Sequence, residues 1–117
     1  MTSKLANQVY DVLRDIFPQA RIFTEHYVNC EGNRLFFDYY LPQYNILVEV
    51  QGEQHYKYTP FFHGAPSDYR QAVKRDKLKQ NYALANNFTL VIVDYNEDVS
   101  REMLLTKISE AQNGLDN

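Results

Sequence analysis

The sequence predicts an α/β fold in which one mixed β-sheet is flanked by helices. The chain has 117 residues, which is close to the usual size of one domain. Helical and strand-like patterns follow each other in the order helix, strand, strand, strand, helix, strand, helix. Short turns join the first three strands into an antiparallel meander, whereas the last strand follows a helix and so favours parallel pairing with an earlier strand. We therefore expect residues 1–117 to form a single domain.

The first half of the chain contains one helix and three strands. Apolar residues recur at helical spacing from Leu5 to Ile16, which predicts a helix over residues 3–17 that ends at Pro18. A tight turn at residues 31–34 joins the first two strands. Alternating or β-branched segments predict these strands over residues 20–29, 35–41 and 46–51.

The second half begins with an irregular stretch, residues 52–66. Ser67 can cap a helix that runs to about Ala85, where Asn86 and Asn87 stop it. The remaining elements are a nearly continuously apolar strand, typical of one covered on both faces, and a final helix. They span residues 88–95 and about 98–112.

Two acids in the middle of the second and third strands are expected to face each other. If Gln43 and Tyr44 form a two-residue loop, antiparallel pairing places Asp38 directly opposite Glu49. Their Cβ atoms would then lie roughly 4.5–5.5 Å apart. Like charges in this position destabilise a sheet, and burial of unpaired carboxylates is costly. A hard divalent cation is the simplest compensation.

Other polar residues converge on this acid pair. Gln51 alternates onto the strand face of Asp38 and Glu49. A helical wheel places Asp76 on the stripe of its helix that should pack on the sheet. Large apolar residues flank the acids on the same face, namely Phe36, Tyr40 and Leu47. They argue against the alternative that this face is merely exposed to solvent, and such conflicts of pattern tend to mark functional sites.

Charge is unevenly distributed along the chain. The net charge is −3, but five of the twelve Lys and Arg residues fall within ten positions that hold one acid, Asp76. The five are Arg70, Lys74, Arg75, Lys77 and Lys79. This patch could neutralise several phosphates of a nucleic acid, although a solvated helix face has the same pattern.

The composition indicates a globular protein outside the membrane. Hydrophobic residues make up 44% of the chain, but no run of ~18 apolar residues could span a bilayer. The N-terminal segment MTSKLANQ lacks the apolar core of a signal peptide, so we expect a cytoplasmic protein. The single cysteine, Cys30, cannot form an internal disulfide.

Two runs of sequence, DYYLPQYNILVEVQGEQHY and KRDKLKQNYALANNFTLVIVDY, carry a family resemblance. The chain resembles the PD-(D/E)XK, restriction-endonuclease-like nucleases over residues 35–95. Within them it is most similar to the branch of very short patch repair endonucleases and phage-associated homing endonucleases, whose signature is abbreviated EDxHD. The motifs D-(aromatic)-x-L-P, E-V-x-G-x-Q-H and R-D-x-x-K occur here in that order.

The resemblance implies a restriction-endonuclease-like core and a set of catalytic residues. Asp38 would be the central metal-binding aspartate and Glu49 the second acid. Gln51 would occupy the place of the usual lysine. His55 and Asp76 would match the histidine and the last acid of the signature.

The resemblance also implies a metal cofactor and a DNA substrate. Mg²⁺ or Mn²⁺ would be held by Asp38, Glu49 and the carbonyl oxygen of Val50, and would lower the pKa of a bound water. His55, with an ordinary pKa near ~6.5, could exchange that proton. Asp76 would orient His55 or complete the metal shell. The basic residues placed near the nucleic acid are Lys57, Arg70, Lys74, Arg75 and Lys79.

The sequence departs from the family pattern at two places. The first acid of the family lies on the opening helix, where this chain has Ala6 and Asn7, and Asp11 falls on the polar side of that helix. Gln51 in place of lysine shifts the burden to His55 and to the basic residues of the later helix.

Glu25 is a candidate replacement for the missing acid. A two-residue Gly32-Asn33 loop would pair Tyr27 with Asp38 and place Glu25 on the same face, one step along. The segment 56–66, which includes His63, forms either a flap over the nucleic acid or a cover for the sheet edge.

These observations predict a metal-dependent DNA endonuclease, either a nicking enzyme or one specific for a site or a branched structure. The alternative is a non-catalytic module that retains the nuclease fold and binds DNA or protein. Since a cut through both strands usually needs two active sites, a homodimer is an open option.

Overall fold

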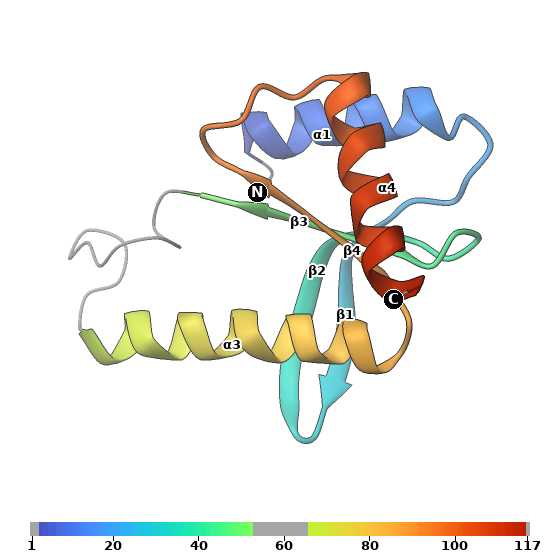
Figure 1. The fold of residues 1–117 in the computed structure, drawn as a ribbon. Helices are drawn as coiled ribbons and strands as arrows, with labels where there is room; N and C mark the ends of the chain where they lie inside the picture. Colours follow the sequence, from blue (N-terminus) through green and yellow to red (C-terminus); the bar gives the residue numbers. More distant parts are fainter. Residues whose placement is uncertain (1–2, 53–65, 117) are drawn as a thin grey trace.

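The computed structural model describes residues 3–52 and 66–116. Within these ranges, three helices and four strands follow each other in the predicted order (Figure 1). They are α1 (Lys4–Ile16), β1 (Phe23–Cys30), β2 (Asn33–Leu41), β3 (Ile46–Gln51), α3 (Pro66–Ala85), β4 (Thr89–Asp94) and α4 (Arg101–Asp116). None of the helices in the described ranges is long and apolar enough to cross a membrane.

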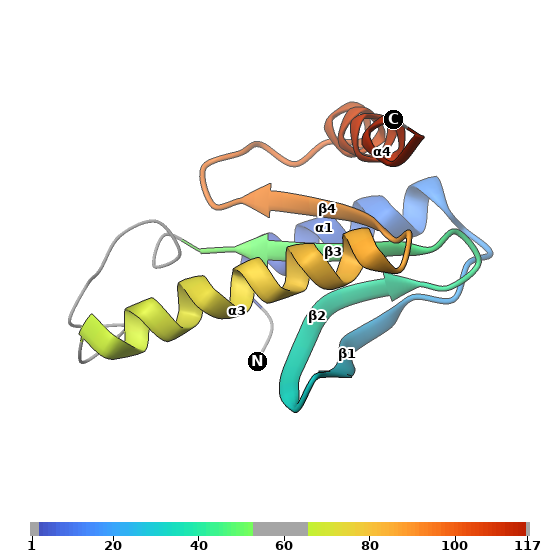
Figure 2. The same cartoon turned by 60° about the horizontal axis from the view of Figure 1, so that its bottom comes forward.

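The strands form one mixed sheet in the order β1-β2-β3-β4. The first three strands pair antiparallel, whereas β3 and β4 are parallel from Ile46↔Thr89 to Gln51↔Asp94. Helix α3 covers one face of the sheet, and α1 and α4 cover the other (Figures 1 and 2). The predicted fold class is therefore confirmed as a mixed α/β sheet between helices.

The β2–β3 register agrees with the prediction, although the loop is longer. Tyr39 pairs with Val48, and Leu41 pairs with Ile46. The loop therefore contains four residues, from Pro42 to Asn45, rather than two. The Tyr44 N–H donates to the carbonyl of Leu41 at 3.2 Å. The register survives because both loops have the same centre, but the ladder with β3 begins one residue further along each strand.

The predicted β1–β2 register was wrong by two residues. Cys30 pairs with Asn33, so the loop is Glu31-Gly32 and Tyr27 lies opposite Phe36 instead of Asp38. Both loop residues have positive φ, 52° at Glu31 and 84° at Gly32. A two-residue turn of this kind requires positive φ at both central positions, and glycine meets that requirement at the second one. The expected loop had placed glycine first.

The connection from α3 to β4 has the predicted asparagine stop. Asn87 adopts a left-handed conformation with φ of 60°. The Phe88 N–H donates to the carbonyl of Ala83 at 2.9 Å, and the Asn87 N–H donates to that of Leu84 at 3.3 Å. This pair of bonds is a Schellman motif, which satisfies the last carbonyls of the helix and turns the chain into β4.

The core consists of two clusters, one on each side of the sheet. The cluster beneath α1 and α4 includes Tyr39 and Leu41 of β2. The cluster beneath α3 includes Leu35 and Phe37 of the same strand. The change from one cluster to the other occurs at Asp38, where the pairing with β3 has ended. Figure 2 shows β1 and β2 curving away from β3 and β4.

Candidate active site at the separation of two strands

Asp38 and Glu49 lie where β2 separates from β3, and their side chains continue the contacts of the ladder. The main-chain N–H of Asp38 donates to Oε1 of Glu49 at 3.1 Å. In return, the main-chain N–H of Val50 donates to Oδ2 of Asp38 at 2.7 Å. Carboxylates are strong acceptors for such bonds. Each of the two acids that the sequence predicted to be opposed thus accepts a hydrogen bond from a backbone N–H of the other strand.

A groove of about 370 Å³ lies beside Asp38 and opens toward the start of α1. It is lined by Ser3, Ala6, Thr24, Glu25, Asp38, Tyr39 and Val50. Ala6 therefore stands at the site where the resemblance expects an acid from the opening helix. Asn7 and Asp11 are exposed and do not line this groove.

Glu25 shares the groove with Asp38 despite the error in register. Its neighbours pair as Thr24↔Tyr39 and His26↔Phe37, which leaves Glu25 across from Asp38. A two-residue shift preserves the face of a strand because side chains alternate with period two. Glu25 itself has φ of 50° and is not part of the ladder. The described geometry is compatible with Glu25 as the additional acid.

Glu49 is buried and forms an ion pair with α3. Only 6% of the residue is exposed, and Nζ of Lys79 lies 2.9 Å from its Oε2. Burial raises the pKa of Glu49, while the ammonium of Lys79 acts against this rise. The Lys79 ammonium also lies 5.6 Å from the centroid of the Phe37 ring. Lys79 therefore links α3 to the two central strands, β2 and β3, of the sheet.

Gln51 and Asp76 are the other predicted residues that the structure brings to Glu49. A small pocket is lined by Glu49, Gln51 and Asp76 together with Lys79, Gln80, Leu90 and Ile92. Its volume is about 10 Å³, so these side chains are closely packed. Gln51 is buried and Asp76 is half-buried. The helical wheel had placed Asp76 on the sheet side of α3 correctly.

The predicted basic residues divide between two locations. Arg70 and Lys74 are exposed on α3, whereas Arg75 and Lys79 line a groove of about 150 Å³ next to β2. Arg34 and Phe36 complete this groove with Ala72 and Asp76. Sequence reasoning had placed Phe36 beside the acids but missed Arg34 as a site neighbour. The signal was available, because Arg34 precedes Phe36 by two positions and so shares its strand face by period-two alternation.

Tyr39 fixes the start of α1 against the site. Its hydroxyl donates to the carbonyl of Ala6 at 2.8 Å. Burial, with the nearby Asp38 carboxylate, raises the pKa of Tyr39 to about 12. The phenol therefore stays protonated at neutral pH and keeps this hydrogen bond.

The oxygen donors of this site are of the type that Mg²⁺ prefers, but they are few. Among the described residues, no group of three or more His, Cys, Asp or Glu side chains is placed to hold a metal ion. The carboxylates of Asp38 and Glu49 and the carbonyl of Val50 are hard oxygen donors. Mg²⁺ commonly binds through one or two carboxylates and keeps several waters. The predictions for His55, Lys57 and the segment around His63 lie outside the described residues.

Comparisons with known proteins identify relatives without a described activity. No protein-family model matches the chain, and no solved structure matches it significantly. It is 42% identical over 65 residues to "Uncharacterized protein 307L" of Invertebrate iridescent virus 6, which covers 55% of this chain and 33% of the relative. It is 33% identical over 85 residues to "Uncharacterized protein 033L" of Invertebrate iridescent virus 3, which covers 72% of this chain and 43% of that relative. The chain spans less than half the length of either protein.

Proposed function

We propose that the protein is a metal-dependent endodeoxyribonuclease with a restriction-endonuclease-like core. The observation that carries the proposal is the meeting of Asp38 and Glu49 at the point where β2 leaves β3, with Lys79 bonded to Glu49. The order of elements, with a meander, a helix and a parallel strand, supports the resemblance. A nuclease needs acids that hold a metal beside a cation that can face a phosphate, and this site supplies both.

The two acids account for the cofactor in the proposal. Like charges at this spacing raise the free energy of the folded protein, and a divalent cation offsets that cost. Asp38, Glu49 and the carbonyl of Val50 would hold Mg²⁺ or Mn²⁺. The bound ion would polarise the phosphate and lower the pKa of a coordinated water. Glu25 lines the same groove as Asp38 and is a described source of a third carboxylate.

Two backbone N–H groups and one lysine side chain hold the acids in place. The Val50 N–H orients the carboxylate of Asp38, and the Asp38 N–H orients that of Glu49. Lys79 approaches Glu49 from α3, close to Gln51. In the proposal its ammonium stabilises the negative charge that develops on the phosphate, which is the part that a lysine at position 51 would have played. The resemblance assigns the proton transfer to His55.

A non-catalytic DNA-binding module is the second candidate. It is favoured by Ala6, which stands at the helix position where the resemblance expects an acid. It is also favoured by Glu49, because one of its oxygens accepts from Asp38 and the other from Lys79. A metal ion would have to share that carboxylate with both donors.

Cleavage assays separate the two candidates. The protein is incubated with supercoiled, linear and branched DNA in Mg²⁺ or Mn²⁺, and the products are resolved on gels. We expect cleavage by the wild type, a loss of at least 100-fold in Asp38→Asn and Glu49→Gln, and no loss in the exposed control Asp11→Asn. Binding without cleavage under every metal would reject the enzyme. The pattern of single-strand nicks or double-strand breaks, together with the molecular mass of the protein in solution, shows whether a homodimer acts. We also propose that the protein is located in the cytoplasm.

A further inference from the structure

One face of the β1–β2 hairpin presents two exposed aromatic rings. Phe36 is 52% exposed and Tyr27 is 46% exposed. The two residues are direct cross-strand partners, and their ring centroids lie 5.4 Å apart. Core packing does not explain this exposed pair, because the neighbouring core residues of β2, Leu35 and Phe37, point to the other side of the strand.

Cations lie beside Phe36, one member of the aromatic pair. The groove between β2 and α3 is lined by Phe36, Arg34, Arg75 and Lys79, with Asp76 as its acid. Lys79 is paired with Glu49. Among the described residues no acid forms an ion pair with Arg34 or Arg75. The groove therefore combines an aromatic surface with two arginines whose guanidinium groups can donate hydrogen bonds to a phosphate.

Lys79 places this groove next to the acid pair. The lysine lines the groove together with Phe36 and Arg34, and its ammonium lies 2.9 Å from Oε2 of Glu49. The aromatic surface and its two arginines therefore border the candidate site.

We propose that this groove binds one unpaired nucleotide of a nucleic-acid strand beside the Asp38–Glu49 centre. The base stacks on the rings of Phe36 and Tyr27, and a flanking phosphate contacts Arg34 and Arg75. An aromatic surface favours an unpaired base because the faces of a paired base are covered within the duplex. The substrate class rests on the proposed nuclease function, which then acts at a single-stranded segment, a flap or a junction.

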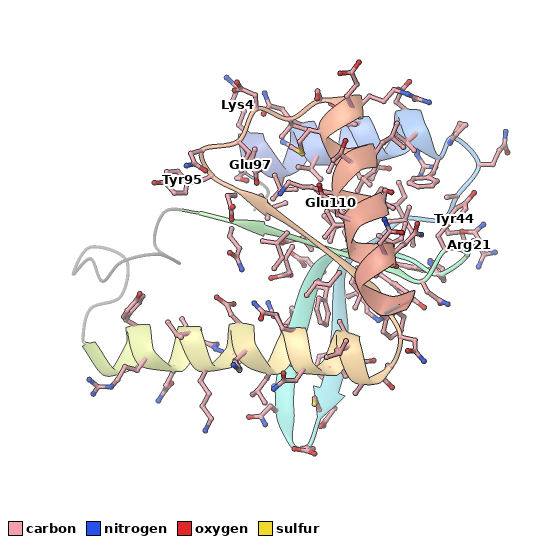
Figure 3. All side chains as sticks on the ribbon, in the orientation of Figure 1. Lys4, Arg21, Tyr44, Tyr95, Glu97 and Glu110 are labelled. Atoms are coloured by element: carbon pink, nitrogen blue, oxygen red, sulfur yellow. The ribbon has the colours of Figure 1, made fainter. Side chains whose placement is uncertain are left out.

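A tryptophan reporter tests the stacking directly. The chain has no tryptophan, so Phe36→Trp introduces a single fluorophore at the proposed surface. In EDTA, which prevents metal-dependent cleavage, a single-stranded oligonucleotide and a junction should quench its emission saturably. A blunt duplex of equal length should quench it weakly. The matched control is Tyr44→Trp, because Tyr44 is 48% exposed and lies in the β2–β3 loop at the other end of β2 (Figure 3).

Affinity measurements separate the ring from the charge. By anisotropy of a labelled single strand in EDTA, Phe36→Leu should weaken binding about tenfold, and Phe36→Tyr should retain it. Arg34→Gln should weaken binding and lower the slope of log affinity against log salt by about one. The control Arg21→Gln removes an exposed arginine at the far end of the molecule (Figure 3) and should leave the slope unchanged. Melting temperatures establish that each variant is folded.

Two outcomes of the binding experiments would overturn the inference. One is equal quenching by single-stranded and duplex DNA with no effect of Phe36→Leu. The other is an emission change that depends on protein concentration alone, which would make the hairpin a surface for self-association. Asp38-dependent cleavage that is indifferent to Phe36 would retain the nuclease and reject the groove. Ring-dependent binding without any cleavage would retain the groove and reject the nuclease.

Discussion

Asp38 and Glu49 exchange hydrogen bonds through the backbone at the point where their strands part. The Asp38 N–H donates to the side chain of Glu49 at 3.1 Å, and the side chain of Asp38 accepts from the N–H of Val50 at 2.7 Å. The carboxylates thus replace main-chain acceptors that the separating strands no longer present to each other. The same bonds hold two like charges together, which makes the pair a testable site for a cation.

Asp38→Asn should separate the charge of this site from its hydrogen bond. An asparagine oxygen can still accept from the Val50 N–H, while the repulsion with Glu49 is removed. We expect the metal-free melting temperature to stay level or rise by about 2–5 °C. Mn²⁺ should raise the melting temperature of the wild type and leave that of Asp38→Asn unchanged. The exposed variant Asp11→Asn should keep the Mn²⁺ response; an unshifted wild type would argue against the metal site.

The ion pair of Lys79 and Glu49 should be strongly coupled. Lys79→Met leaves a buried carboxylate without its cation and should cost about 3 kcal/mol in the free energy of unfolding. Glu49→Gln leaves the ammonium without its acid and should also destabilise. The double variant should be more stable than the sum of the two losses predicts. Urea denaturation measures all three, and additive losses would show that the contact contributes little.

The raised pKa of Glu49 predicts a pH dependence of stability. Because burial raises this pKa above its ordinary value of 4.5, the folded carboxyl binds its proton more tightly than the unfolded one. Its contribution to stability is therefore greatest when it is protonated and falls as the pH rises from 4.5 through the folded pKa. Lys79→Met removes an influence that lowers the pKa, so the fall should extend to higher pH. The difference between wild type and Glu49→Gln, measured from pH 4 to 8, isolates this contribution.

Gln51→Lys tests the part assigned to Lys79. If Lys79 supplies the cation that the resemblance expects at position 51, Lys79→Met should abolish cleavage. Adding Gln51→Lys to that variant should restore activity, because both residues line the small pocket at Glu49. Gel assays on one DNA substrate compare the single and double variants. A double variant that is stable but inactive would assign Lys79 a structural role alone.

Two glycines should respond in opposite directions to alanine. Gly32 has φ of 84° and Gly114 lies in α4, and neither has an atom within 4 Å of an added Cβ. Gly32→Ala should cost about 1–2 kcal/mol because an L-residue is strained in the left-handed region. Gly114→Ala should stabilise by up to about 1 kcal/mol, since alanine is the better helix former. The melting temperatures of both variants check these predictions, and that of Gly32→Ala reports on the turn between β1 and β2.

Local pattern was enough to predict much of this fold. The parallel orientation of β4 was expected from the intervening helix, although its partner, β3, was not specified. The opposition of Asp38 and Glu49 was expected too, because the centre of the β2–β3 loop is marked by its polar residues. The error in the β1–β2 hairpin was an ambiguity about which side of Gly32 the turn occupies. Strand periodicity places residues on faces but leaves such two-residue shifts undecided.

The sequence by itself determined the order of elements, the faces of the strands and the identity of the two acids, because these depend on neighbours within a few residues. Only the tertiary structure decided that β2 leaves β3 at Asp38, that Lys79 reaches Glu49 from 30 positions away, and that Arg34 lines a groove with Lys79. Those contacts depend on how far the hairpin curves and where α3 crosses it. Both are set by the packing of Leu35 and Phe37 against α3, which no local pattern encodes.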